Sequence, residues 1–245
     1  MTKRIENKCA LCLQRKLLCH SHIIPELCYG PAYDNNHRAQ MMNSLNLRKQ
    51  IIQKGLREYL LCEECEKKLN KHETYFKTIW FDQKVLPSHV ISRTPITISS
   101  IDHKHFKLFH LSVLWRAAVA SIEPFDTVDL GPYEEKLRQH LYNDDPGNDH
   151  FCPFYGIVIV NPDTTVCYDI VTGPYQSRFE HSHVYYMCYA GCEWTFIVTE
   201  RNFARSEYKD LTVKMNSPIV LGAFPFDEIN FVKVFGEQRS TISRK

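Results

Sequence analysis

The chain has 245 residues, of which 44% are hydrophobic and 24% are charged, and its formal net charge is +2. This is the composition of a globular protein with room for one large domain or two small ones. The N-terminal residues are charged and no apolar signal segment follows, and the most apolar run, residues 106–120, contains His110 and Arg116 and is too short to span a bilayer. We therefore expect a cytoplasmic protein with no membrane partner.

Two short cysteine motifs come first along the chain. They are Cys9-Ala-Leu-Cys12 and Cys62-Glu-Glu-Cys65, about fifty residues apart. Without a secretory signal, ten cysteines argue against disulfides, and paired cysteines at this spacing favour a metal. A two-residue gap lets both sulfurs of a pair face one tetrahedral Zn²⁺, and four protein ligands leave no open coordination position. The sequence thus predicts a structural zinc ion, with four reduced core cysteines as the alternative.

The segment between and after these motifs completes an expected N-terminal domain over residues 1–82. Residues 30–50 are polar and rich in turn formers, which predicts a loop insertion. The second cysteine pair leads into a segment that favours helix as far as about Phe81, with Leu69 and Phe76 one heptad apart on one face.

A second domain is expected over residues 83–245. Residues 86–101 are typical of a linker with β character. Asp102 is a candidate N-cap for a helix over about 102–121, and this helix is apolar nearly all round, so we expect it to be central and buried. Another helix is predicted over about 132–142, because Pro132 stands at its start and acidic residues follow in its first turn. Residues 143–148 are a strong turn signal.

Strand patterns dominate from about residue 151 to 235. Short runs of β-branched and aromatic residues predict strands near 155–160, 184–189, 193–199 and 219–224, with a hairpin turn at Ala190-Gly191. We expect a mostly antiparallel sheet, and we interpret Cys188 and Cys192 as a cross-strand pair in its core. The predicted fold class is therefore α+β: a zinc-bound N-terminal unit, a buried central helix and an antiparallel sheet.

Three sequence segments carry a resemblance to known families. Ser21-His-Ile-Ile-Pro25 between the cysteine pairs, followed by Leu60-Leu-Cys-Glu-Glu-Cys-Glu66, resembles the order of motifs in zinc-stapled HNH endonucleases, which implies a treble-clef finger. The chain is also similar to bacterial proteins with an S-H-I-I-P finger. They share the Lys107–Arg116 segment (KLFHLSVLWR) and the Leu130–Arg138 segment (LGPYEEKLR), and some are linked to anti-phage defence.

The HNH resemblance implies specific roles. In those enzymes a histidine of the strand deprotonates water, and one divalent ion stabilises the developing charge on the phosphodiester. Carried over by position, His22 is the base and Glu66 is the ligand on the helix for Mg²⁺ or Mn²⁺. Glu73 lies seven residues further on the same helical face and is a candidate second carboxylate. Ser21 stands where the family has an aspartate, and Arg57 where it has an asparagine.

Nucleic acid is the expected partner, DNA rather than RNA. Residues 1–80 contain 14 Lys and Arg against 8 Asp and Glu, a net of +6, whereas the remainder contains 16 against 20, a net of −4. A basic head of this kind favours phosphate contacts, although an ordinary solvated surface is the alternative. The candidates for these contacts are Arg48, Lys49, Lys54 and Arg57.

Two functions from different classes follow. The first is an HNH-type metal-dependent endonuclease that cleaves DNA, acting as an effector of anti-phage defence. The second is a non-catalytic zinc-finger module that binds nucleic acid or a protein partner within a larger defence complex. In that second interpretation His22 hydrogen-bonds within the finger, and Glu66 is an acidic residue stabilised by the helix dipole.

Overall fold

The structure of the chain is a computed structural model that describes residues 5–42, 49–179, 182–201, 210–230 and 232–233. These residues form a mixed α+β fold, as the sequence predicts. The α-helices are α1 (Glu26–Tyr29), α2 (Glu63–Lys77), α3 (His103–Val119) and α4 (Pro132–Asn143). Single turns of other helix types are η1 (Gly30–Ala32), η2 (Thr78–Asp82) and η3 (Phe226–Glu228). Within these residues no helix is long and apolar enough to cross a membrane.

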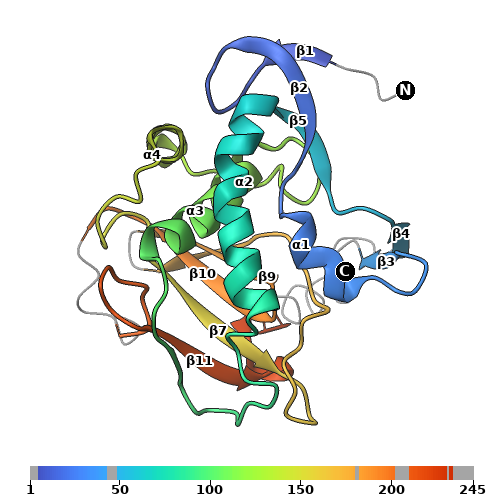
Figure 1. Cartoon of the computed structure of the whole chain (residues 1–245), viewed down its shortest axis with the longest axis vertical. Coiled ribbons are helices and arrows are strands. Elements are labelled where there is room, and N and C mark those ends of the chain that lie inside the picture. The colour runs from blue at the N-terminus through green and yellow to red at the C-terminus, as the bar shows by residue number, and fades with distance from the viewer. Residues whose placement is uncertain (1–4, 43–48, 180–181, 202–209, 231, 234–245) are drawn as a thin grey trace, which may run out of the picture.

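The N-terminal part of the chain contains a three-stranded antiparallel sheet. Its order is β1 (Ile5–Lys8), β2 (Arg15–His22) and β5 (Arg57–Cys62). The segment expected as a loop insertion contains η1 and a separate two-stranded ribbon of β3 (Ala39–Met42) and β4 (Lys49–Ile52). Helix α2 starts at the end of β5 and runs from this sheet towards the centre of the molecule (Figure 1).

Helix α2 is amphipathic. Cys65, Leu69, His72 and Phe76 are its buried residues, and they recur at helical spacing on one face. Acidic side chains in its first turn interact favourably with the helix dipole. The helix begins at the second cysteine pair, as expected, and η2 continues it to Asp82.

Helix α3 is the central buried helix. Asp102 accepts a hydrogen bond from the backbone N–H of His105 at 3.1 Å, so the predicted N-cap is confirmed. Every residue from Phe106 to Ala117 is buried, which explains why the helix is apolar nearly all round. Helix α4 starts with Pro132 as predicted and ends at Asn143; the next residue, Asp144, caps it in a left-handed conformation with φ of 60°.

The body contains a six-stranded sheet with the order β6-β11-β7-β10-β9-β8. Its strands are β6 (Ile96–Ile98), β7 (Phe154–Val160), β8 (Tyr175–Phe179), β9 (Ser182–Tyr189), β10 (Cys192–Val198) and β11 (Ile219–Pro225). Only the β11–β7 pair is parallel, so the sheet is mostly antiparallel, as predicted. The segment expected as a linker supplies the edge strand β6.

The β9–β10 hairpin turns at Ala190 and Gly191, which have φ of 55° and 78°. Two positive φ values are what a two-residue hairpin turn needs, and this prediction is confirmed. The turn places Cys192 opposite Tyr189 and Cys188 opposite Glu193. The predicted cross-strand pairing of the two cysteines is therefore wrong: Cys188 packs in one hydrophobic cluster and Cys192 in another.

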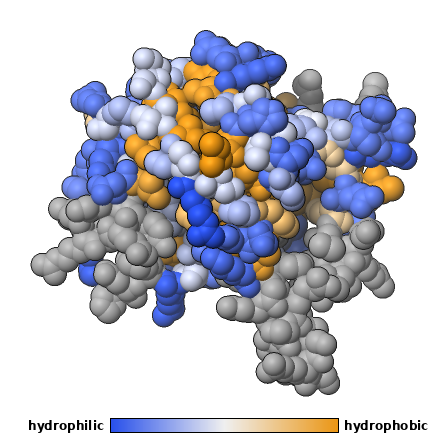
Figure 2. Space-filling view, turned by 90° about the horizontal axis from the view of Figure 1, so that it is seen from below, coloured by the Kyte–Doolittle hydropathy of each residue, from blue (hydrophilic) through white to orange (hydrophobic). Residues whose placement is uncertain are grey.

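One hydrophobic core contains residues of both halves of the chain. Leu61 of β5, Phe76 of α2, Trp115 of α3 and Trp194 of β10 all belong to it, and the rings of Phe76 and Phe109 stack at 4.0 Å. A second, smaller cluster covers the other face of the six-stranded sheet. Figure 2 shows the molecule from below: apolar residues lie in the middle of this face, and hydrophilic residues lie around them. The division at residue 82 stays a prediction.

Candidate functional site

The four predicted zinc ligands come from two places in the N-terminal sheet. Cys9 and Cys12 lie in the tight turn between β1 and β2, where the N–H of Leu13 donates to the Cys9 carbonyl at 2.9 Å. Cys62 is the last residue of β5, and Cys65 lies in the first turn of α2. Antiparallel pairing of β2 with β5 brings the two motifs together.

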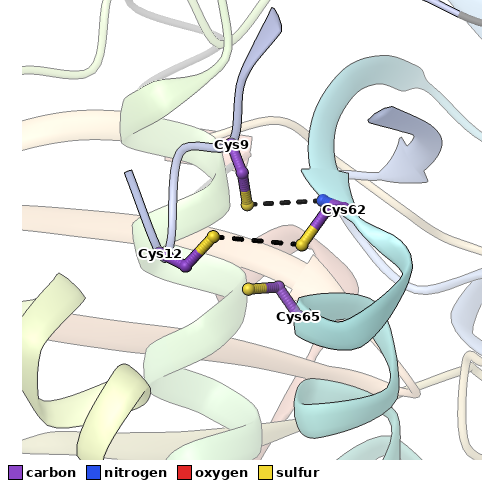
Figure 3. A group of neighbouring side chains, drawn as sticks. All are labelled: Cys9, Cys12, Cys62 and Cys65. Carbon is purple, nitrogen blue, oxygen red and sulfur yellow. Dashed lines mark hydrogen bonds between the residues drawn. The ribbon is translucent and has the colours of Figure 1, made fainter. Parts of the chain in front are cut away.

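The four sulfur atoms lie within 4.8 Å of one another and face a common point (Figure 3). Zinc–sulfur bonds of roughly 2.3 Å in a tetrahedron place neighbouring sulfurs about 3.8 Å apart, and the sulfurs of Cys12 and Cys62 are 3.9 Å apart. The backbone N–H of Cys62 donates to the Cys9 sulfur at 3.3 Å. All four thiols are free, and the donor set and spacing fit a tetrahedral metal such as zinc.

His22 ends strand β2, far along the strand from the cysteines, and it lies opposite Arg57 in the register. Its Nε2 atom is 2.8 Å from Oε2 of Glu26 and is shielded from solvent. Burial is the main factor that lowers the pKa of His22, and the positive charges of Arg57 and Arg116 act in the same direction, whereas Glu26 opposes them. The imidazole is therefore uncharged at neutral pH.

Glu26 in α1 has four polar neighbours. One carboxylate oxygen faces His22 and accepts the N–H of Gly55 at 3.1 Å. The other oxygen accepts the hydroxyl of Tyr33 at 2.9 Å and lies 3.4 Å from Nε2 of His37. Burial raises the pKa of Glu26, but these hydrogen bonds and His22 outweigh it, so the pKa is lowered and the carboxyl stays ionised.

Sequence reasoning missed Glu26, Tyr33 and His37. No helical spacing could have predicted Glu26, because His22 ends strand β2 and Glu26 begins α1 after a non-helical connection. Tyr33 and His37 follow in the segment that was expected to be only a loop. Their rings pack against each other with centroids 4.0 Å apart.

The two predicted carboxylates, Glu66 and Glu73, have other partners. Burial raises the pKa of Glu66, although Ser21 and Arg116 oppose the shift; its Oε1 atom is buried with no hydrogen-bond partner among the described residues. Glu73 is 2.8 Å from Nη2 of Arg116, a side chain that is 1% exposed. Arg116 also donates to the His22 carbonyl at 3.0 Å. Glu73 is thus linked to the backbone of His22, and the catalytic roles of both carboxylates stay predictions.

Ser21 has a structural environment. It is 2% exposed, and its hydroxyl accepts the backbone N–H of Leu61 at 3.2 Å. Neighbouring residues of a strand point to opposite faces. Ser21 therefore points to the face of the sheet that α2 covers, where Glu66 lies. The His22 ring points to the other face and lies beside Glu26.

The predicted phosphate contacts are described only in part. Lys54 is exposed, and Arg57 is half-buried beside His22. Arg48 lies outside the described residues, as does the side chain of Lys49, whose backbone begins β4. On the strands next to His22 and Arg57, the rings of His20 and Tyr59 stack with centroids 4.8 Å apart.

Comparison with known proteins finds no match to this chain among protein-family models, curated proteins or solved structures.

Proposed function

We propose that this chain is a zinc-stapled treble-clef protein of the HNH type, a metal-dependent endonuclease that cleaves DNA phosphodiesters with His22 as the general base. The observation that carries the proposal is an uncharged His22 at the end of β2, with a carboxylate 2.8 Å from Nε2 and Arg57 opposite it. An uncharged imidazole can accept a proton from water, and a neighbouring carboxylate stabilises the imidazolium that results.

The zinc ion has a structural role in this proposal. Four thiolates complete a tetrahedron and leave no position for water. The ion would join the β1–β2 turn to the start of α2 and so fix the strand that carries His22. Two observations support this structural role. The four sulfurs converge on one point, and they lie at the opposite end of β2 from His22.

A divalent ion, Mg²⁺ or Mn²⁺, would supply electrostatic stabilisation of the charge that develops on the phosphate. Glu66, with Glu73, is the ligand set that the HNH resemblance implies. The proposed DNA contacts are Lys54 and Arg57, together with Arg48 and Lys49. The stacked rings of His20 and Tyr59 lie beside them and offer a π-face to a base. A role in anti-phage defence depends on the resemblance alone.

One observation favours the second candidate, a non-catalytic module that binds nucleic acid or a partner protein. Glu73 is paired with the buried Arg116, and burial raises the pKa of Glu66, which disfavours its charged form. If both carboxylates serve only to hold the finger against the body, the finger has a binding surface without its expected metal ligands.

DNA cleavage separates the two candidates. Zinc-replete wild type and His22→Ala are incubated with plasmid and single-stranded DNA in Mg²⁺ or Mn²⁺, with His150→Ala, an exposed histidine of the body, as the matched control. We expect wild type and His150→Ala to cleave, and His22→Ala to lose roughly 100-fold or more of the rate, the scale of general-base catalysis. Equal cleavage by all three would reject His22 as the base. DNA binding without cleavage by the wild type would support the non-catalytic module.

A further inference from the structure

The carboxylate of Glu26 is held from several sides. Tyr33 donates its hydroxyl to one oxygen and Gly55 donates its N–H to the other. Burial and the nearby Glu26 charge raise the pKa of Tyr33 to about 12, so this phenol remains a donor at neutral pH. Gly55 has no substitute here, because an added Cβ would lie 2.3 Å from the ring of Tyr29. The carboxylate therefore has a fixed position relative to β2.

The contact between His22 and Glu26 defines where the imidazole carries its proton. Nε2 is shielded from solvent and lies 2.8 Å from an ionised oxygen, in a close charge contact that is not an aligned hydrogen bond. If Nε2 carried only its lone pair, two electron-rich atoms would lie at this distance from each other. A proton on Nε2 turns that repulsion into an attraction. The uncharged ring then leaves Nδ1 as the nitrogen that can accept a proton.

We propose that Glu26 is the positioning residue of this site: it holds His22 as the Nε2–H tautomer, leaves Nδ1 to accept the proton of water, and stabilises the imidazolium that forms. This inference deepens the proposed nuclease function and rests on it for its chemical purpose. In the step, the O–H bond of water breaks as its oxygen attacks phosphorus, and its proton moves to Nδ1 of His22. One bridging P–O bond of the phosphodiester breaks at the same time, and the leaving alkoxide takes a proton from solvent water. Glu26 remains ionised throughout and gains a charged partner.

Tyr33 and His37 act on Glu26 and not on His22. Tyr33 fixes one carboxylate oxygen, and His37, whose side chain is 63% exposed, lies at the outer edge of the cluster. His37 has φ of 55°, a conformation that asparagine adopts readily. His37→Asn therefore removes the imidazole without straining the turn, and it is the variant that tests the edge of the cluster.

The test is a ¹⁵N-histidine NMR titration of the zinc-replete full chain, which needs no catalytic activity. In the wild type we expect His22 to be the Nε2–H tautomer at neutral pH. Glu26→Gln keeps an oxygen that can accept from Nε2 but removes the charge, so the pKa of His22 should fall below its wild-type value while the tautomer persists. His37→Asn should change the pKa of His22 less than Glu26→Gln does. Glu6→Gln, which removes an exposed carboxylate on β1, should leave it unchanged.

The pH profile of cleavage gives the second measurement. Removing the Glu26 charge should lower the rate by roughly 10- to 100-fold, within the range of general-base catalysis, and should shift the limb that reports base deprotonation to lower pH. An Nδ1–H tautomer in the wild type, or an unchanged His22 pKa in Glu26→Gln, would overturn the proposal even if the protein cleaves DNA. The expected NMR result in a protein that does not cleave DNA would uphold the positioning of His22 and reject the nuclease function.

Discussion

His72 is a buried titratable residue in a cluster of charged and ionisable side chains. Its side chain is 1% exposed, and Nε2 lies 3.0 Å from Asp144. Its Nδ1 lies 3.2 Å from Nδ1 of His105, so only one of these two atoms can carry the shared proton. Lys71 and Lys104 also form ion pairs with Asp144, and they offset its negative charge. Burial therefore dominates and lowers the pKa of His72 to about 4, although Asp144 opposes the shift.

This shift predicts a loss of stability in mild acid. The unfolded chain binds a proton at His72 below about pH 6.5, whereas the folded chain resists it until about pH 4. Between these values the unfolded state holds more protons, so the free energy of unfolding falls as the pH falls. His72 alone should remove about 1 kcal/mol between pH 7.5 and pH 5.5.

Urea unfolding of the zinc-loaded protein at both pH values measures this loss. Other buried histidines contribute in the same direction, so the comparison is with His72→Gln, which keeps a donor for Asp144 but cannot be protonated. The variant should lose about 1 kcal/mol less than the wild type between the two pH values. Zinc content is measured at each pH. An identical loss in both proteins would show that His72 does not titrate as described.

At the scale of elements, Arg116 joins α3 to the N-terminal unit. It is 1% exposed, pairs with Glu73 of α2 and donates to the carbonyl of His22 at the end of β2. Its own helix supplies further acceptors at Ser112. One guanidinium thus donates to acceptors on a strand and on two helices.

Removing Arg116 should therefore cost more than removing a surface charge. Arg116→Met leaves Glu73 without its cation in a site that is 17% exposed, and we expect a loss of about 3 kcal/mol in the free energy of unfolding. Replacing both partners, Arg116→Met with Glu73→Met, should recover at least about 1 kcal/mol of it, because the unpaired charge is gone. Lys67→Met, which removes an exposed pair with Glu63, should cost far less than Arg116→Met. Denaturant unfolding of the wild type and these three variants measures the losses, and equal losses in Arg116→Met and the double variant would contradict the prediction.

Elements defined by local signals could be predicted from the sequence. Asp102 and Pro132 marked the starts of two helices, and Ala190-Gly191 marked the hairpin. Features that depend on register or on distant contacts were missed. The pairing of Cys188 with Cys192 failed because the two-residue turn sets them on opposite faces of the sheet.

The candidate site also has features that local sequence signals predict and features that depend on distant contacts. Spacing alone predicted the four cysteines, because each pair is local and the two pairs need only a shared ion. The environment of His22 depends on Tyr33, His37 and Gly55, which reach Glu26 only after the segment between the strands folds back. That return path has no short-range signature in the sequence.

At the scale of the whole molecule, hydrogen bonds cross between the N-terminal unit and the body at several places. Arg138 of α4 donates to the carbonyl of Leu11 in the cysteine turn at 2.7 Å. The N–H of Ser121 donates to Glu58 of β5 at 2.7 Å. The indole of Trp80 donates to the carbonyl of Ala190 in the β9–β10 turn at 2.8 Å. Because of these contacts and the shared core, the fold of the cysteine site and the fold of the body stabilise each other.

Metal removal should therefore unfold the whole chain in one transition. A structural zinc ion contributes binding energy directly to folding, and 1 kcal/mol shifts the Tm of a chain of this size by roughly 2–4 °C. We expect chelation, or Cys62→Ala, to lower the Tm by at least about 10 °C. Tryptophan fluorescence, which reports Trp80, Trp115 and Trp194 in the core, and far-UV circular dichroism should follow the same curve.

Cys19→Ser, which replaces a half-buried cysteine outside the four, should keep the metal and a Tm near that of the wild type. If the metal-free protein instead showed two separate transitions, with the tryptophans melting at the Tm of the loaded protein, the body would be stable without the finger. The shared core would then contribute little to the coupling. A single transition at a lower Tm would mean that loss of the metal at the cysteines also releases the strand that carries His22.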